Sequence, residues 1–330
     1  MECVQNVTLD PCGTLSLHPT ISNNSMSLRY EVGRWTLQRV HHSYVPSEDA
    51  TCRSKGWVVT SRLVHFPHVS EQLFQAIEHA MSTSEEHQMV LHPPKAHNNS
   101  WVRGLLRTVS NKIHLADISC TRTRYSRGGY CFRSLCYFQR TPNSWFKTRQ
   151  GCHRLRELVY ASLNVSREKC PPAVILSRRK SRKIINAHEV AVLIRSVLNV
   201  EPATVDFEEY SFEEQVTCLS GAQFLFAAHG AGLTNLVFLP SGARIVEFFP
   251  YNYVPSQKWY DQLATECGHY HIPIFSRNNA ALADLHCAYG YRNSSLTECM
   301  SVYSCRSCMR LANVHVDIGL LSQALGKLKY

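Results

Sequence analysis

Short apolar runs alternate with amphipathic stretches from residue 171 onward. Each run is bounded by turn residues and is rich in branched or aromatic side chains, which is typical of a strand buried on both faces. Five such strands alternating with helices predict an α/β fold, with a mostly parallel sheet covered by helices on both faces. The expected strands are 173–177, 203–207, 224–228, 244–248 and 271–275.

Capping residues indicate where the helices of this region begin. Asn186 and Ser211 are each followed three residues later by a glutamate, which is the spacing of a capping box. A last amphipathic helix is expected within 314–328, where apolar residues recur at helical spacing. The expected helix starts between the strands are Asn186, Ser211, Gly232 and Ser256.

Residues 1–150 have a weaker pattern that is rich in turn residues. Trp57–Val59 indicates a strand. The amphipathic stretch at 70–81 predicts a short helix with Ser70 as its N-cap. The change of pattern places a domain border between residues 150 and 170.

Composition narrows the class of protein. The chain has 330 residues, of which 44% are apolar and 18% are charged, so it can bury two cores of ordinary size and is not disordered. No uninterrupted apolar run approaches the length of about eighteen residues that a membrane-spanning helix needs. We therefore expect a globular protein with two cores.

Cysteines and glycosylation motifs indicate the compartment. Fourteen cysteines are many for a cytosolic enzyme and favour an oxidising environment. The first residues lack the basic and apolar regions of a signal peptide, so we expect a trimmed or partial N-terminus. We predict the lumen of the endoplasmic reticulum or Golgi, with membrane attachment only through a segment absent from this chain. Five Asn-x-Ser/Thr motifs agree with this compartment, at Asn6, Asn23, Asn98, Asn164 and Asn293.

The turn that follows the strand at 224–228 carries the most informative chemistry. From His229 to Asn235 it reads His-Gly-Ala-Gly-Leu-Thr-Asn. Gly230 and Gly232 permit a tight turn and close approach of a ligand, and we expect phosphates in the space beside Gly232. The amide groups of the following helix favour an anion there. The alternative is an ordinary glycine-rich turn in which His229 is only packed or capping.

Three segments here resemble glycosyltransferase family 61. They are His229–Asn235, then Phe-Leu-Pro-Ser-Gly-Ala at 238–243, then Val-Glu-Phe-Phe-Pro at 246–250. The basic stretch at 175–183 is also similar to the family's basic loop. The family includes plant xylosyl- and arabinosyltransferases and animal O-linked N-acetylglucosaminyltransferases that act on EGF domains and dystroglycan. The resemblance covers residues 150–330.

The resemblance implies a GT-B-like fold, with two Rossmann-like domains facing a cleft. It implies an acceptor-side domain over 1–160, whole or incomplete, and a domain over 161–330 that binds the nucleotide sugar. The implied reaction is inverting transfer of xylose, arabinose or N-acetylglucosamine from a donor, expected to be UDP-linked, to a hydroxyl of a protein or glycan. No cofactor is expected, and a role for a divalent metal is left open. The implied donor-binding residues are Arg178, Arg182, His229, Gly230, Ala231, Gly232, Thr234, Asn235 and Glu247.

The basic loop after the first predicted strand suits a diphosphate. Five of the six residues from Arg178 to Lys183 are cationic. They can neutralise a leaving diphosphate, whose charge grows as the glycosidic bond breaks. We favour Arg178 for this role, whereas Lys180 and Lys183 are expected to face water. The alternative is a solvated basic cluster that binds heparin or nucleic acid; the net charge of +10 suits both, but we expect no nucleic-acid partner because no reading module is present.

Two further roles require a carboxylate or an imidazole. Glu247 follows an apolar run and can accept hydrogen bonds from ribose hydroxyls, or it can cap a neighbouring helix. Inversion needs a general base, and the family's N-terminal domain carries a histidine followed shortly by an acidic residue. The nearest match is the stretch 65–71, where the spacing is one residue shorter than in the family. The candidate bases are therefore His68, Glu71 and His65, with His229 as an alternative.

The cysteines of the C-terminal tail allow two interpretations. A Cys-x2-Cys spacing is half of a zinc-binding pattern, but disulfides are favoured in an oxidising compartment. The tail cysteines are Cys287, Cys299, Cys305 and Cys308.

A non-enzymatic interpretation also remains open. The shortened spacing between His68 and Glu71 is compatible with a degenerate family member that binds a nucleotide or glycan without transferring sugar.

Overall fold

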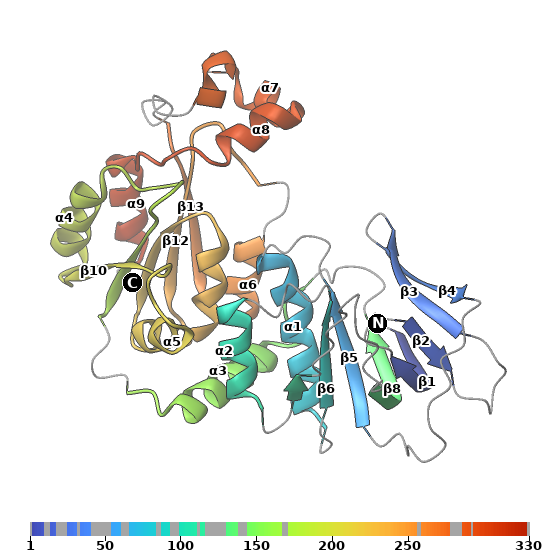
Figure 1. Cartoon of the computed structure of the whole chain (residues 1–330). Coiled ribbons are helices and arrows are strands. Elements are labelled where there is room, and N and C mark those ends of the chain that lie inside the picture. Colours follow the sequence, from blue (N-terminus) through green and yellow to red (C-terminus); the bar gives the residue numbers. More distant parts are fainter. Residues whose placement is uncertain are drawn as a thin grey trace. The chain divides into compact units, whose positions relative to one another are not determined.

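The computed structural model (Figure 1) divides into two compact units, residues 1–162 and 163–330. In the described residues no helix combines the length and the apolar composition needed to cross a membrane. The structure describes residues 2–9, 14–17, 25–31, 34–40, 54–60, 66–83, 87–92, 99–110, 113–115, 130–137, 144–166, 171–255, 259–277, 286–291 and 293–328.

An eight-stranded mixed sheet forms the N-terminal unit, in the order β4-β3-β2-β1-β8-β5-β6-β7. Pairing is antiparallel from β4 to β8 and parallel from β8 to β7. Only the parallel half therefore has the pairing of a Rossmann-like fold, and the predicted strand at 57–59 lies in it. The strands are β1 (Glu2–Leu9), β2 (Thr14–Leu17), β3 (Ser25–Glu31), β4 (Arg34–Val40), β5 (Ser54–Thr60), β6 (His87–His92), β7 (Ile113–Leu115) and β8 (Tyr130–Tyr137).

Helix α1 (Phe66–Met81) begins earlier than its pattern predicts. The expected N-cap Ser70 lies inside the helix, so that prediction was wrong. Pro67 accounts for the difference, because proline is favoured in the first turn, where its missing N–H is not needed. The buried Phe74 packs against Trp101, with ring centroids 6.1 Å apart. The other helices of this unit are α2 (Ser100–Thr108) and α3 (Arg149–Leu163).

A five-stranded sheet forms the C-terminal unit, and every neighbouring pair in its order β10-β9-β11-β12-β13 is parallel. The alternating pattern is thus confirmed. Because β10 lies on one side of β9 and the later strands lie on the other, the winding of the chain reverses between β9 and β11. Ligands of open α/β sheets bind at the carboxyl ends of the strands at such a reversal. The strands are β9 (Ala173–Ser177), β10 (Pro202–Asp206), β11 (Phe224–Ala228), β12 (Arg244–Phe249) and β13 (Tyr270–Phe275).

Helices cover both faces of this sheet (Figure 1). Right-handed crossovers put the helix after β9 on one face and the helices after β10, β11 and β12 on the other. Val246 and Phe248 belong to the core shared with α4 and α9, so Glu247 between them points to the face of α5, η4 and α6. These helices are α4 (Ala187–Leu198), α5 (Phe212–Ser220), η4 (Ala231–Phe238), α6 (Trp259–Glu266) and α9 (Ile318–Leu328).

The two predicted capping boxes have different outcomes. Ser211 and Glu214 form a complete capping box at the start of α5. Asn186 is the N-cap of α4, but its side chain makes no capping hydrogen bond, so its pairing with Glu189 was wrong. The amide group of Asn186 instead donates to the carbonyl oxygen of Val316 and accepts from its N–H, both at 2.9 Å.

The other two expected helix starts also differ from the structure. The segment after the glycine-rich turn is a 3₁₀ helix, η4, whose hydrogen bonds span three residues instead of four. Ser256 lies outside the described residues, and α6 is described from Trp259.

The C-terminal tail is held by disulfides and by backbone pairing. Ile184 and Val314 form a parallel bridge, so the tail runs beside the end of the basic loop. The tail contains η6 (His286–Tyr291), α7 (Leu296–Ser301) and α8 (Tyr303–Met309). Its four cysteines form two disulfides, which confirms that interpretation over zinc, and the pairs are Cys287–Cys308 and Cys299–Cys305.

Asn186→Ala is expected to destabilise the protein more than Ser211→Ala does. The first change leaves the N–H and the carbonyl of buried Val316 without partners, which costs at least about 2 kcal/mol. The second removes an exposed cap that is worth about 1 kcal/mol. Urea unfolding followed by circular dichroism measures both free energies of unfolding. Equal losses would show that Asn186 does not pin the tail.

Candidate functional site

The predicted donor-binding residues gather at the carboxyl edge of the C-terminal sheet. The basic loop leaves β9, and the glycine-rich turn leaves β11, the neighbouring strand. This is the edge at which the winding of the sheet reverses, where α/β folds place their ligands. The proximity of the two segments follows from strand order, which local patterns do not contain.

Two arginines of the basic loop lie against the glycine-rich turn. A Cβ atom at Gly230 would lie 2.5 Å from Arg178 Nη1 and 2.8 Å from Arg182 Nη1. Arg182 Nη1 donates to the carbonyl oxygen of His229 at 2.8 Å, and Arg178 Nε donates to the carbonyl oxygen of Ser181 at 3.2 Å. The missing side chain at Gly230 therefore provides the room that both guanidinium groups occupy.

Arg182 is the more strongly perturbed of these cations. Burial and the like charge of Arg178 lower the pKa of Arg182 to about 10. It remains cationic near neutral pH, but its charge is poorly solvated. An anion bound beside it would restore the favourable interactions that burial removes.

The remaining cations of the loop point elsewhere. Arg179 pairs with Asp206 at 2.8 Å and with Glu209, and the side chains of Lys180 and Lys183 are exposed. The structure thus separates Arg178, which lies against Gly230, from the two lysines, which are exposed.

Gly232 has a different function from Gly230. A Cβ atom at Gly232 would lie 2.6 Å from Leu176 Cδ2, so the protein fills the space in which we expected phosphates. That prediction was wrong, and close packing of η4 on β9 explains the glycine. The amide groups of Ala231 and Gly232 nevertheless precede the first hydrogen bond of this helix, from Leu233 N to Gly230 O at 2.9 Å.

Thr234 and Asn235 lie inside the protein, with exposed fractions of 0% and 2%. The amide of Asn235 donates to Gln215 Oε1 at 3.0 Å and to the Gly232 carbonyl at 3.2 Å. These contacts tie η4 to α5, and a direct contact with a donor remains a prediction for both residues.

A buried carboxylate links the turn to the next two strands. Glu247 is 2% exposed, and its two oxygens are hydrogen-bonded to His229 Nδ1 at 2.6 Å and to His271 Nε2 at 2.8 Å. Burial opposes ionisation of Glu247, but the hydrogen bonds from both histidines outweigh it and lower the pKa of the carboxyl group. The carboxylate is therefore ionised under the turn, and it lies too deep to present an oxygen at the surface.

Aromatic rings enclose the imidazole of His229. Phe249 stacks on it with ring centroids 5.1 Å apart, and Tyr253 and Tyr260 flank it at 5.6 Å. Burial raises the pKa of both tyrosines, so their hydroxyl groups stay protonated. The ring is held by its neighbours as well as by Glu247.

The disulfide-bonded tail contributes to the same cluster. Cys305 and Cys308 share a core with Phe249, the last residue of β12, and with Tyr253 in the loop that follows. Arg310, directly after α8, lies near enough to lower the pKa of Arg182. The sequence contains no local signal for this contact, nor for the role of Tyr253.

His271 could have been found from the sequence. It lies in β13, next to the strand of Glu247, and a polar residue in an otherwise apolar strand is a reason to look for a buried partner.

The candidate general bases are only partly placed. His65 lies outside the described residues, while positions 68 and 71 lie in α1. Their part in catalysis remains a prediction.

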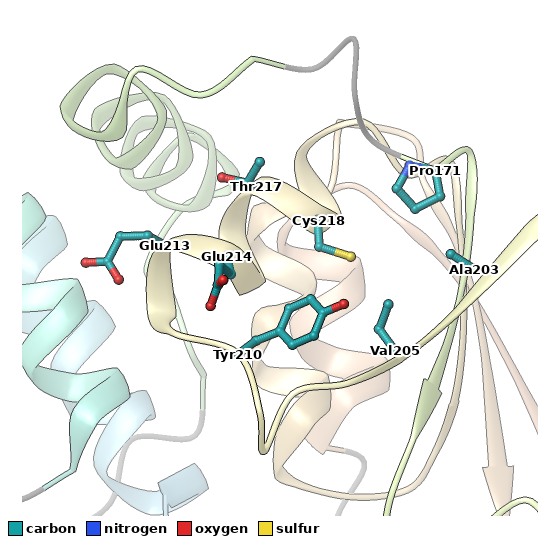
Figure 2. Close-up of a pocket in the computed structure, with 8 residues that line it drawn as sticks. All are labelled: Pro171, Ala203, Val205, Tyr210, Glu213, Glu214, Thr217 and Cys218. Atoms are coloured by element: carbon teal, nitrogen blue, oxygen red, sulfur yellow. The ribbon is translucent and has the colours of Figure 1, made fainter.

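An open pocket of about 420 Å³ lies apart from the turn, between β10 and α5 (Figure 2). Tyr210 and Cys218 line it together with Pro171, which precedes β9. Because Cys218 is in the last turn of α5, this pocket extends toward the amino ends of the strands. It includes none of the predicted site residues.

Known proteins resemble this chain in sequence. Residues 35–246 match the family model described as Glycosyltransferase 61. Protein O-linked-mannose beta-1,4-N-acetylglucosaminyltransferase 2 of Bos taurus is 35% identical over 122 residues, which is 36% of this chain and 20% of that protein. The Xenopus laevis protein of the same name is 39% identical over 82 residues, 25% of this chain and 14% of that protein. Each match spans a fifth of the relative's length or less.

Solved structures resemble the chain weakly. The iron-containing heptosyltransferase TibC, in complex with ADP-D-beta-D-heptose, has a TM-score of 0.43 and 12% identity over 93% of this chain and 83% of that chain. The E. coli heptosyltransferase WaaC has a TM-score of 0.32 and 11% identity over 67% of this chain and 93% of that chain. Scores of this size do not establish a shared fold.

Gly230→Ala is expected to weaken binding of an anion at the turn. The added methyl group would displace the guanidinium groups of Arg178 and Arg182, and we expect at least about a tenfold loss of affinity for inorganic pyrophosphate in calorimetric titration. Gly326→Ala is the matched control, because no atom outside its chain neighbours and the backbone of its own helix lies within 4 Å of the added carbon. Unchanged affinity in Gly230→Ala would show that the arginines do not bind anions here.

Proposed function

The chain belongs to the Glycosyltransferase 61 family, and on that premise we propose that it transfers a sugar from a nucleoside diphosphate donor with inversion at the anomeric carbon. The observation that carries the proposal is the pair of guanidinium groups packed on Gly230 at the carboxyl edge of the parallel sheet. No other described part of the chain combines such charges with a glycine-rich turn. The proposed anion is the diphosphate of the donor.

The chemistry of the leaving group supports this assignment. Breaking the bond between the sugar and the diphosphate places negative charge on the departing oxygen, and preorganised cations stabilise that charge. Arg178 and Arg182 are already in place and held by backbone carbonyls, so they need little rearrangement. The amide groups of Ala231 and Gly232 add two donors at the same turn.

We propose UDP-N-acetylglucosamine as the donor. Of the three sugars considered, xylose, arabinose and N-acetylglucosamine, the relatives' name supports the last. The same name supports a sugar hydroxyl of a glycoprotein as the acceptor. The proposed compartment is the secretory lumen, which the tail disulfides and the glycosylation motifs support. The proposed architecture is GT-B, in which the C-terminal unit binds the donor.

The proposed general base lies in the N-terminal unit. His68 and Glu71, on α1, are the candidates together with His65. A base must take the proton of the acceptor hydroxyl as the oxygen attacks the anomeric carbon. His229 is assigned instead to the donor side, because it directly precedes the turn.

The alternative is a degenerate family member that binds the donor without transferring sugar. The short spacing between His68 and Glu71 supports it. The transferase and the degenerate member can be distinguished by experiment, because both predict nucleotide binding but only the transferase predicts turnover.

Calorimetric titration of the full chain with UDP, GDP and ADP, with and without Mg²⁺, tests the proposed donor site. We expect saturable binding of UDP, weakened about tenfold in Arg178→Ala and about twofold or less in Lys183→Ala. The lysine is a matched control because it carries the same charge in the same loop but is exposed. Equal losses would indicate diffuse electrostatics, and no binding would contradict the proposal.

Turnover is then measured as release of UDP from UDP-N-acetylglucosamine in the presence of O-mannosylated peptide. Sugar transfer that is lost in His68→Ala, with donor affinity unchanged, would support the transferase. Donor binding without transfer would favour the degenerate alternative.

A further inference from the structure

Glu247 is engaged by two histidines and presents no oxygen at the surface for a ligand. Both carboxylate oxygens are hydrogen-bonded to imidazole nitrogens, and the residue is 2% exposed. An ionised carboxylate can only accept hydrogen bonds, so Nδ1 of His229 and Nε2 of His271 must both carry protons. The network therefore determines which nitrogen of each ring is protonated.

This arrangement leaves Nε2 as the functional atom of His229. Within the described part of the chain Nε2 has no hydrogen-bond partner, whereas Nδ1 is bound and the ring is packed between Phe249, Tyr253 and Tyr260. The backbone of His229 is held as well, since its N–H donates to Phe248 O at 2.8 Å and its carbonyl accepts from Arg182. Ring and backbone are thus fixed one residue before the turn that faces two guanidinium groups.

We infer that Glu247 and His271 are positioning residues that hold His229 as an imidazolium whose Nε2 donates to the diphosphate of the bound donor. The inference rests on the proposed function. Glu247 is then not a ribose ligand; it acts through His229, and its negative charge compensates the proton that the ring carries on Nε2. His271 occupies the second oxygen and prevents the carboxylate from rotating away.

The surroundings contain charges of both signs. Arg178 and Arg182 disfavour a further cation beside the turn, while the carboxylate of Glu247 at 2.6 Å favours it. An anionic ligand changes this balance, because it attracts the imidazolium and the arginines together. The titratable and charged groups that face the cluster are Glu247, His271, Tyr253, Tyr260, Asp261, Arg178, Arg182, Arg306 and Arg310.

The first arm of the test compares donor affinity across pH. UDP-N-acetylglucosamine is the probe, because its diphosphate has no terminal phosphate that titrates between about pH 5.5 and 8.5. A required imidazolium predicts that affinity falls as pH rises, since the ring loses its Nε2 proton. We expect this slope to vanish in His229→Gln and to persist in the control His188→Gln, which changes an exposed histidine of α4.

The second arm asks whether Glu247 acts through His229. We expect Glu247→Gln to weaken donor binding about tenfold, and Glu247→Asp, which keeps the charge, to recover part of the loss. In a double-mutant cycle the effect of Glu247→Gln should disappear in the His229→Gln background. Additive losses would show a merely structural role and overturn the inference.

The third arm needs no ligand, and its readout comes from the wild-type chain. Imidazole ¹⁵N shifts of the wild-type chain, assigned with His229→Gln and His271→Gln, should show a proton on Nδ1 of His229 and on Nε2 of His271. A ring of His229 without a proton on Nδ1 would overturn the inference whatever the nucleotide does. If the shifts are as expected but no nucleotide binds, the proposed function fails, and with it the proposed hydrogen bond from Nε2 of His229 to a diphosphate.

Discussion

Two guanidinium groups pack against the backbone of Gly230, and the geometry of the candidate site depends on this contact. Bringing Arg178 and Arg182 together costs free energy, since burial and like charge already lower the pKa of Arg182 to about 10. Carbonyl oxygens of His229 and Ser181 offset part of that cost. An anion bound at the turn, as proposed, would offset the rest of that cost, and strongly perturbed charges are concentrated at functional sites in proteins generally.

The position of those arginines depends on parts of the chain that are remote in sequence. The basic loop ends at Ile184, which pairs with Val314, and Asn186 is bonded through its amide group to Val316. The disulfides link the preceding helices of the tail to one another, and their buried cysteines pack in one core with Tyr253 of the loop after β12, which flanks His229. The tail therefore braces both sides of the site, and the cysteines serve the geometry of the turn as well as stability.

The sheet explains why a carboxylate lies under the turn. Side chains alternate between the faces of β12, so Glu247 must point to the face opposite Val246 and Phe248. On that face it is covered by η4 and α6, and only its two histidine partners make its burial tolerable. An ionised group under the glycine-rich turn orders the imidazole of His229 above it, which links the core of the sheet to the candidate site at its edge.

The sequence by itself determined the parallel sheet, the start of α5 and the stretch that forms the site. Buried parallel strands are continuous apolar runs, and a capping box is a contact between residues three apart. Both can therefore be recognised from a short stretch of sequence. The sequence also determined that Arg178 and the glycine-rich turn lie at the same edge of the sheet, because both follow the carboxyl ends of parallel strands. That they are neighbours there depends on the order of the strands, which the sequence does not contain. Only the tertiary structure decided what each polar residue meets. The pairing of Glu247 with His229 and His271, Leu176 beside Gly232 and the bond from Asn186 to Val316 join residues 18 to 130 positions apart. Periodicity and spacing carry information only about residues that are near in the sequence. Contacts between distant residues form only when the sheet and its covering helices have packed together.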